Sequence, residues 1–236
     1  MANILAIDTS SEGCSVALSI DDRVEAIYLD APRQHTQKIL PLIDDLLGKT
    51  GITLAQCEAI VYGRGPGSFT GLRICLGVAQ GLGYAIESPL VAVSSFDTLI
   101  EEASHLYRLS AGDKVLVAID ARMEEVYWRV YRYSGEEFEP VTDESLSSPE
   151  QVVQALSDIG LLALKLGSGC TYPALTELSA TAEHIQLQPK AEFMLPVARR
   201  MLARGEVVAP ECAEPTYLRD SVAWQKRQRI RTLCNR

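Results

Sequence analysis

The chain has 236 residues, of which 47% are hydrophobic and 22% charged, and its formal net charge is −9. This composition is that of a globular protein with one large or two small cores, and it excludes a disordered chain. No apolar run approaches the roughly 20 residues of a membrane-spanning helix, and the six cysteines form no Cys-x-x-Cys pair. The first eight residues lack a basic segment, and Asp8 interrupts their apolar run, so we expect no signal peptide. We therefore expect a cytoplasmic protein with reduced thiols and no membrane partner.

The first half predicts a three-stranded meander followed by alternating strands and helices. Short apolar or alternating runs separated by turn-forming residues predict strands at 4–8, 14–18, 24–29, 59–62 and 89–93. Helical spacing of apolar residues predicts helices at 36–47, 68–86 and 94–107. This order is typical of a mixed sheet flanked by helices.

The second half repeats the opening of the first. The run Leu5–Thr9 (LAIDT) recurs as Val117–Ala121 (VAIDA), and each copy precedes two further short strands. Helices near 149–157 and 189–203 and a strand at 161–166 complete this half. The duplication predicts an α/β fold of two lobes with mixed sheets, divided as an N-terminal lobe at 1–111, a smaller C-terminal lobe at 112–216 and a basic tail at 217–236.

The tail carries six basic residues and one acid, which makes it +5 and leaves about −14 for the rest of the chain. An acidic body is a poor platform for RNA phosphates, so a nucleic-acid role would be indirect or would use the tail. The alternative is a solvated tail without a ligand.

The helix predicted at 68–86 is apolar over an unusually wide face. Its apolar and glycine residues fill an arc of about 220°, whereas a helix packed on one sheet needs only about 100°. The excess predicts a second burial surface, which could be the second lobe, the first helix or a partner protein. Gly77 and Gly81, four residues apart, would allow another helix to approach closely.

Several polar residues and glycines stand where strands end, and open α/β sheets bind ligands outside the carboxyl ends of their strands. Ser68 is also a natural N-cap, and a helix N-terminus can hold an anion. The alternative is that these residues cap and pack their own turns. The candidate nucleotide or phosphate contacts are Asp8, Thr9, Ser10, Gly65, Gly67, Ser68, Asp120, Arg122, Gly167, Ser168 and Gly169.

Metal-dependent catalysis has little support in the sequence. A catalytic zinc needs about three protein ligands, and the three histidines, His35, His105 and His184, show no ligand spacing. We expect no metal site and no catalytic residue.

Six motifs spread over nearly the whole chain resemble the tRNA threonylcarbamoyladenosine biosynthesis protein B (TsaB) family. They are Ile7–Ser10, Arg33–Gln37, Gly63–Arg73, Val93–Asp97, Asp120–Arg122 and Pro215–Arg219. The resemblance implies two actin-like lobes, the fold shared by acetate and sugar kinases, heat-shock chaperones and actin.

The resemblance also implies a role as the non-catalytic subunit that binds and activates the enzyme forming N6-threonylcarbamoyladenosine at position 37 of tRNAs reading ANN codons. The metal-binding histidines of the paralogous transferase align with Ser95 and Leu99 here. Implied partners are that transferase subunit, a small ATPase subunit, a second copy when alone, and tRNA indirectly. No cofactor is expected to bind tightly, although ATP or ADP could occupy the assembled complex.

The resemblance places the partner interface on the first two helices. The expected interface residues are Ile39, Leu40, Ile43, Leu46, Leu47, Phe69, Leu72, Arg73, Ile74, Leu76, Gly77, Val78, Gln80 and Gly81. Two other functions remain open at this point: a nucleotide-dependent kinase or ATPase with an interlobe site, and a metallopeptidase.

Overall fold

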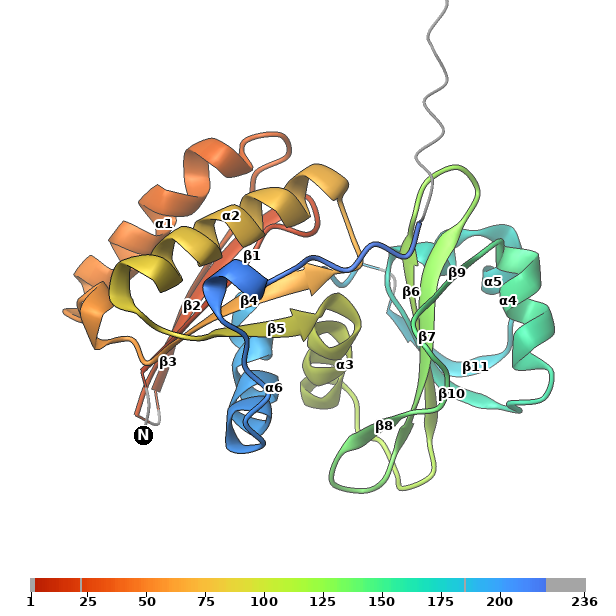
Figure 1. The fold of residues 1–236 in the computed structure, drawn as a ribbon. Helices are drawn as coiled ribbons and strands as arrows, with labels where there is room; N and C mark the ends of the chain where they lie inside the picture. Colours follow the sequence, from red (N-terminus) through yellow and green to blue (C-terminus); the bar gives the residue numbers. More distant parts are fainter. Residues whose placement is uncertain (1–2, 22, 185, 220–236) are drawn as a thin grey trace, which may run out of the picture.

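The computed structural model describes residues 3–21, 23–184 and 186–219. Figure 1 shows two lobes side by side, each built on its own sheet. The predicted fold class, an α/β fold of two lobes with mixed sheets flanked by helices, is confirmed.

The first sheet has the strand order β3-β2-β1-β4-β5. Its strands are β1 (Ile4–Asp8), β2 (Gly13–Ile20), β3 (Arg23–Asp30), β4 (Ala59–Gly65) and β5 (Leu90–Ser94). The first three form the predicted antiparallel meander, and β4 and β5 run parallel to β1. The helices α1 (His35–Thr50) and α2 (Phe69–Ile86) cover one face of this sheet (Figure 1).

The second sheet has the order β11-β10-β6-β7-β8, and β9 pairs with β7. Its strands are β6 (Lys114–Asp120), β7 (Val126–Tyr133), β8 (Phe138–Pro140), β9 (Ser145–Ser147), β10 (Leu162–Leu166) and β11 (Ala180–His184). The helices α4 (Pro149–Leu156) and α5 (Pro173–Thr176) lie on its outer face. The single-turn 3-10 helices are η1 (Leu54–Gln56), η2 (Ser168–Thr171) and η3 (Pro210–Cys212).

Two helices pack differently from the predicted division of the chain. The helix α3 (Ser95–Leu106), assigned to the first lobe, buries Phe96 and Leu99 against the second sheet. The helix α6 (Ala191–Ala203), assigned to the 112–216 lobe, buries Met194 and Leu195 against the first sheet. Apolar periodicity shows that a helix has a buried face, but it does not say which sheet that face covers.

The segment 214–219, here called the C-terminal strap, crosses both lobes (Figure 1). On the first lobe the Tyr62 hydroxyl donates to the Glu214 carbonyl at 3.0 Å, and the Thr216 amide donates to the Arg64 carbonyl at 2.7 Å. On the second lobe Arg219 pairs with Glu125 at 2.5 Å. Residues 217–219 of the predicted tail therefore belong to the strap. The rest of the predicted tail, 220–236, lies outside the described residues.

An ion-pair network between the lobes is centred on Glu144. Arg64 of β4 donates to both oxygens of this carboxylate, at 3.0 and 2.6 Å. The Ser94 hydroxyl donates to it at 2.7 Å, and Arg129 of β7 lies 3.4 Å away. Because both partners of the Arg64–Glu144 pair are largely buried, with side-chain exposures of 25% and 11%, water screens the pair weakly.

Replacing Arg64 by Met should therefore lower the free energy of unfolding by about 2 to 3 kcal/mol, since it leaves a buried carboxylate short of a partner. Urea denaturation monitored by circular dichroism measures this. The matched control is Arg132→Met, because Arg132 pairs with Glu139 in solvent. Exposed pairs contribute roughly 0 to 1 kcal/mol. Equal losses for the two variants would contradict the interlobe role of Arg64.

Candidate functional site

The carboxylate of Asp8, at the end of β1, is enclosed by the protein. Its Oδ1 accepts hydrogen bonds from the Ser10 amide at 2.9 Å and the Ser10 hydroxyl at 2.8 Å, and Oδ2 has no partner. A Cβ on Gly63 would lie 1.9 Å from Oδ2, so the carboxylate packs directly on β4. Burial raises the pKa of Asp8 to about 6. Asp8 therefore does not face an open cleft, contrary to the expectation for a nucleotide contact.

The glycine-rich turn before α2 is filled by the loop that follows β1. The Ser68 amide donates to the Ser10 carbonyl at 2.7 Å, and the Ser68 hydroxyl caps the helix by accepting from the Gly71 amide at 3.3 Å. A Cβ on Gly67 would lie 2.4 Å from the Ser10 carbonyl oxygen, and one on Gly71 would lie 1.9 Å from that of Thr9. The glycines thus allow close backbone packing where a phosphate would have to bind.

The corresponding residues of the second lobe also form hydrogen bonds and an ion pair with one another. Asp120 Oδ1 accepts from the Arg122 amide at 2.8 Å and the Tyr172 hydroxyl at 3.0 Å, and Oδ2 pairs with the Arg122 guanidinium at 3.1 Å. The Ser168 hydroxyl accepts from the Asp120 amide at 3.0 Å. This arrangement favours the turn-capping alternative.

The remaining glycines of the candidate nucleotide site also serve packing. Gly167 has a φ of 90°, and a Cβ there would lie 2.3 Å from the Ala118 carbonyl oxygen. A Cβ on Gly169 would lie 3.0 Å from the Ala118 carbonyl carbon, and one on Gly65 would lie 2.9 Å from the Leu72 side chain. The structure brings the first-lobe candidates into one cluster and the second-lobe candidates into another. Asp8, Thr9 and Ser10 are buried, whereas Ser68, Arg122 and Ser168 remain exposed.

Ser95 and Leu99, at which the resemblance implies that metal ligands are replaced, are both buried. The Ser95 hydroxyl donates to the Ser10 hydroxyl at 3.3 Å, and Leu99 packs in the core between α3 and the second sheet. Within the described ranges, no group of three or more His, Cys, Asp or Glu side chains could hold a metal ion.

The structure decides which edge of α2 belongs to the core. The fully buried residues are Gly71, Leu72, Cys75, Ala79 and Gly83. The opposite edge is open: Ile74 and Val78 are half-buried, and Gly77 and Gly81 are exposed, with nothing within 4 Å of an added Cβ at either glycine. Among the described helices, α2 alone has the length and hydropathy of a membrane span, although a helix packed on a sheet passes the same test. Its open edge therefore presents two exposed glycines flanked by half-buried aliphatic side chains.

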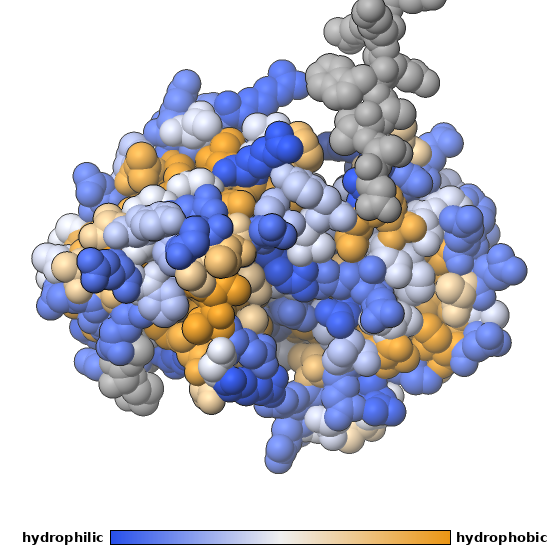
Figure 2. Space-filling model, viewed as in Figure 1, coloured by the Kyte–Doolittle hydropathy of each residue, from blue (hydrophilic) through white to orange (hydrophobic). Residues whose placement is uncertain are grey.

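A groove of about 530 Å³ runs between α1 and α2 and is called the α1/α2 groove here. It is lined by Leu40, Pro41, Ile43, Asp44, Leu47, Leu54 and Leu82. Leu40 is 53% exposed. Figure 2 shows apolar residues gathered over these helices. Of the expected interface residues, Ile39, Leu46 and Leu72 are instead fully buried in the subunit's own core, so they are not available to a partner.

The N-terminal turn of α2 meets the C-terminal strap on a separate surface. The rings of Phe69 and Tyr217 lie 5.3 Å apart, and the Arg73 guanidinium lies 3.8 Å above the Phe69 ring. Arg73 Nε donates to the Tyr217 hydroxyl at 3.0 Å. Farther along, Gln80 donates to the Pro210 carbonyl at 2.9 Å, so it is engaged by the chain itself. The sequence missed Tyr217, because only the fold brings the strap to α2.

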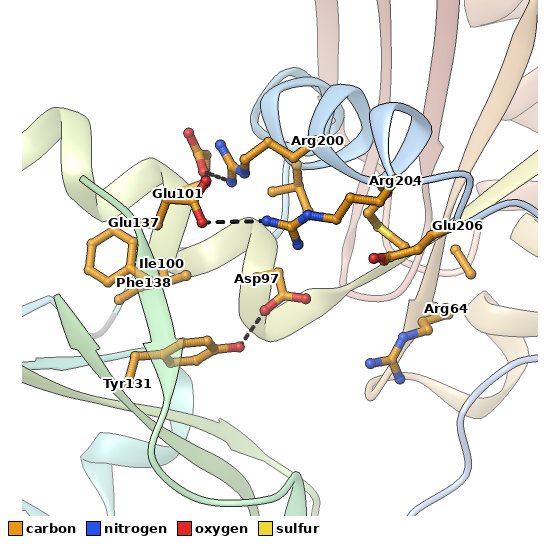
Figure 3. A pocket seen from close by; sticks show the side chains of 13 residues that line it. Arg64, Asp97, Ile100, Glu101, Tyr131, Glu137, Phe138, Arg200, Arg204 and Glu206 are labelled. Carbon is orange, nitrogen blue, oxygen red and sulfur yellow. Dashed lines mark hydrogen bonds and ion pairs between the residues drawn. The ribbon is translucent and has the colours of Figure 1, made fainter. Parts of the chain in front are cut away.

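The sequence also missed a polar pocket of about 300 Å³ between the lobes. Its lining comes from α3, α6, both sheets and the adjoining loops, and Figure 3 shows the labelled side chains around it. Arg200 pairs with Glu101 at 2.7 Å, and Arg204 with Glu137 at 3.5 Å. The Tyr131 hydroxyl donates to the nearby Asp97 at 2.6 Å, and burial raises the pKa of Asp97. The paired charges link α6 to α3 and to the second lobe.

Comparison with known proteins assigns the family. The family model described as TsaD, tRNA N6-adenosine threonylcarbamoyltransferase, matches residues 29–227. The tRNA threonylcarbamoyladenosine biosynthesis protein TsaB of Escherichia coli (strain K12) is 44% identical over 94% of this chain and 97% of its own. The protein of the same name from Haemophilus influenzae is 38% identical over 94% of this chain and 96% of its own.

Two solved structures agree with this assignment. YeaZ from Pseudomonas aeruginosa is 41% identical, with a TM-score of 0.83 over 92% of this chain and 100% of that one. A second Pseudomonas aeruginosa structure, described as an uncharacterized protein with similarity to peptidase YeaZ, is 41% identical, with a TM-score of 0.84 over 93% of this chain and 100% of that one. The motifs, the fold and these matches agree: the chain belongs to the TsaB family of tRNA threonylcarbamoyladenosine biosynthesis proteins.

Proposed function

We propose that this chain is a non-catalytic subunit that binds and activates the enzyme forming N6-threonylcarbamoyladenosine at position 37 of tRNA. The observation that carries the proposal is the open apolar edge of α2 beside the α1/α2 groove. An exposed apolar surface next to a groove marks a protein-binding site. The family relationship indicates the pathway, which is tRNA threonylcarbamoyladenosine biosynthesis.

Several side chains of this subunit are unsuited to catalysis. Ser95 and Leu99 stand where the transferase carries histidines, and both are buried by neighbours. Asp8, which could serve as a general base, is enclosed and bonded to Ser10. Asp120 is bonded to Arg122 and Tyr172, and Glu101 and Glu137 of the interlobe pocket are paired with arginines, so none of these carboxylates is a free general base.

The proposed partner is the TsaD-like transferase. Because one family model covers both proteins, the partner would present a similar helix pair, and two such pairs can pack as a four-helix interface. In this assembly the transferase moves the threonylcarbamoyl group from its adenylate to N6 of the adenosine. A small ATPase would dock on the pair, ATP or ADP would bind only in the assembly, and a second copy would cover the same face when the chain is alone.

The glycines of the open edge give a test with opposite effects on stability and association. Gly77→Ala and Gly81→Ala should each raise the free energy of unfolding by about 0.5 to 1 kcal/mol, because alanine is the better helix former and its methyl group meets no atom. Both should weaken association, because the methyl groups separate the two helices. Thermal melting and calorimetric titration with the transferase measure the two effects.

Gly48→Ala in α1, where an added Cβ is also unobstructed, is the control for stability alone. The function itself is tested by tRNA modification with the adenylate supplied. The transferase should need this chain, and this chain alone should modify nothing. Activity of the chain alone would refute the proposal, ATP turnover by the pure chain would favour a kinase or ATPase, and a tightly bound stoichiometric zinc or iron would favour a peptidase.

A further inference from the structure

The turn between β6 and β7 has a backbone conformation that its own residues do not favour. Arg122, Met123 and Glu124 have φ angles of 62°, 58° and 59°, so three successive residues lie in the left-handed region. Turns of this hand are normally built from glycine, asparagine or aspartate, because larger residues are strained there. All three residues are exposed, and Asp120 bonds the first of them, Arg122. Another group therefore has to hold the rest of the turn.

The guanidinium of Arg219, the last residue of the C-terminal strap, spans this turn. Its Nη2 donates to the Ala121 and Arg122 carbonyl oxygens at 3.2 and 3.3 Å and pairs with the Glu125 carboxylate at 2.5 Å. Its Nη1 lies 2.8 Å from the sulfur of Met123. The Arg219 side chain is 16% exposed, so water screens these contacts weakly. One side chain of the strap thus binds both ends of the strained turn.

The strap passes from one lobe to the other between two adjacent residues. Thr216 is bonded to Arg64 of β4 through both its amide and its hydroxyl. The Tyr217 ring packs against Phe69 of α2, whereas Leu218 packs against the core between α3 and the second sheet. Consecutive Cα atoms are only about 3.8 Å apart, so there is no slack between the two anchors. A displacement of the lobes at this point has to break one of them.

The two anchors differ in what their release requires. On the first lobe, release breaks a main-chain hydrogen bond, the contact of Thr216 with Arg64 and the stacking of Tyr217. On the second lobe, withdrawal of the Arg219 guanidinium frees the turn, and the strain of its three left-handed residues is then relieved. This relief offsets part of the free energy lost with the Arg219 contacts. The strap is therefore poised to open at Arg219.

We propose that the strap and the β6–β7 turn form a clasp between the lobes. The clasp is closed while Arg219 binds the left-handed turn, and it is open when the guanidinium withdraws and the turn relaxes. The closed clasp fixes the orientation of the second lobe relative to the first, and the open clasp lets that orientation change. A change between two lobe orientations needs such an element with two discrete arrangements. The clasp lies within one chain and does not depend on the partner proposed above.

A comparison of two backgrounds tests whether Arg219 imposes the conformation of the turn. Glycine adopts a positive φ without strain, so Glu124→Gly should raise the Tm of the otherwise unmodified chain by about 2 to 4 °C. In an Arg219→Met chain the turn is already relaxed. There Glu124→Gly should leave the Tm unchanged or lower it, because glycine makes the unfolded chain more flexible. Equal increases in both backgrounds would overturn the proposal, because the turn would then not depend on Arg219.

The matched control is Glu87→Gly. Glu87 follows the last residue of α2, has a φ of 53° and is exposed, as Glu124 is. The end of the helix fixes its conformation, so Glu87→Gly should raise the Tm equally in both backgrounds. If the Arg219→Met background removed this increase as well, the variant would have lost structure in general, and the proposed role of Arg219 in the turn would be wrong.

Residual dipolar couplings of the backbone amides, recorded on the chain alone, measure the orientation of the lobes. One alignment tensor should fit both sheets of the unmodified chain and of Glu124→Gly, because the clasp is closed in both. Arg219→Met should need a separate tensor for each sheet. A single tensor shared by both sheets of Arg219→Met would contradict the clasp, because the lobes would then keep their orientation without it.

Discussion

Leu40→Asp should leave the chain folded and abolish its association with the transferase, whereas Leu72→Asp should unfold it. Leu40 is 53% exposed in the α1/α2 groove, so a charge there stays hydrated in the free subunit and costs about 0.5 kcal/mol or less. Against an apolar partner the same charge loses its water, and affinity should fall at least a hundredfold. Leu72 is 1% exposed, and a buried unpaired charge there costs several kcal/mol, a large part of a domain's stability.

Thermal melting and co-purification with the transferase separate the two outcomes. Val78→Asp, on the open edge of α2, should likewise prevent association, but at a larger cost in stability than Leu40→Asp, because Val78 is half-buried against the first-lobe core. Lys49→Asp in the last turn of α1, which removes a solvent-exposed ion pair with Asp45, controls for added charge on this side of the lobe and should affect neither measurement. Normal binding by both Leu40→Asp and Val78→Asp would show that the groove is not an interface.

Asp8→Asn should make the protein more stable at neutral pH, by an amount that disappears in acid. In the folded protein the pKa of Asp8 is raised from 3.8 to about 6. Ionisation of Asp8 therefore destabilises the folded state relative to the unfolded state. That cost is absent below pH 3.8, grows between there and pH 6, and is complete above pH 6. A shift of this size corresponds to about 3 kcal/mol. The stability difference between variant and wild type should therefore rise by roughly 2 to 3 kcal/mol from pH 4 to pH 7.5.

Urea denaturation across this pH range measures the difference. The contributions of all other titrating groups to the free energy of unfolding cancel, because variant and wild type share these groups. The control is Asp120→Asn at the equivalent strand end of the second lobe, which removes a partly exposed ion pair with Arg122. A stability difference for Asp8→Asn that does not change with pH would show that the Asp8 carboxylate is hydrated in solution.

The sequence was sufficient to predict features that depend on neighbouring residues along the chain. Alternation and turn residues located both meanders, and helical spacing located α1, α2 and α3 to within a few residues. Ser68 caps α2 as expected, because a hydroxyl before a helix needs only the next turn to accept its hydrogen bond. The motifs also identified the family, which the comparisons confirm.

The sequence could not predict which surfaces meet across the chain. The width of the apolar arc on α2 indicated two burial surfaces, but only packing against the sheet shows that Leu72 lies inside and Val78 at the open edge. The sequence predicts that Asp8 faces a cleft, whereas in the structure Gly63 and Ser10 enclose its carboxylate. The assignment of α3 and α6 to opposite sheets and the contact of Tyr217 with Phe69 were likewise decided by the tertiary structure. Periodicity records how much of a segment is buried, and only the folded chain determines what buries it.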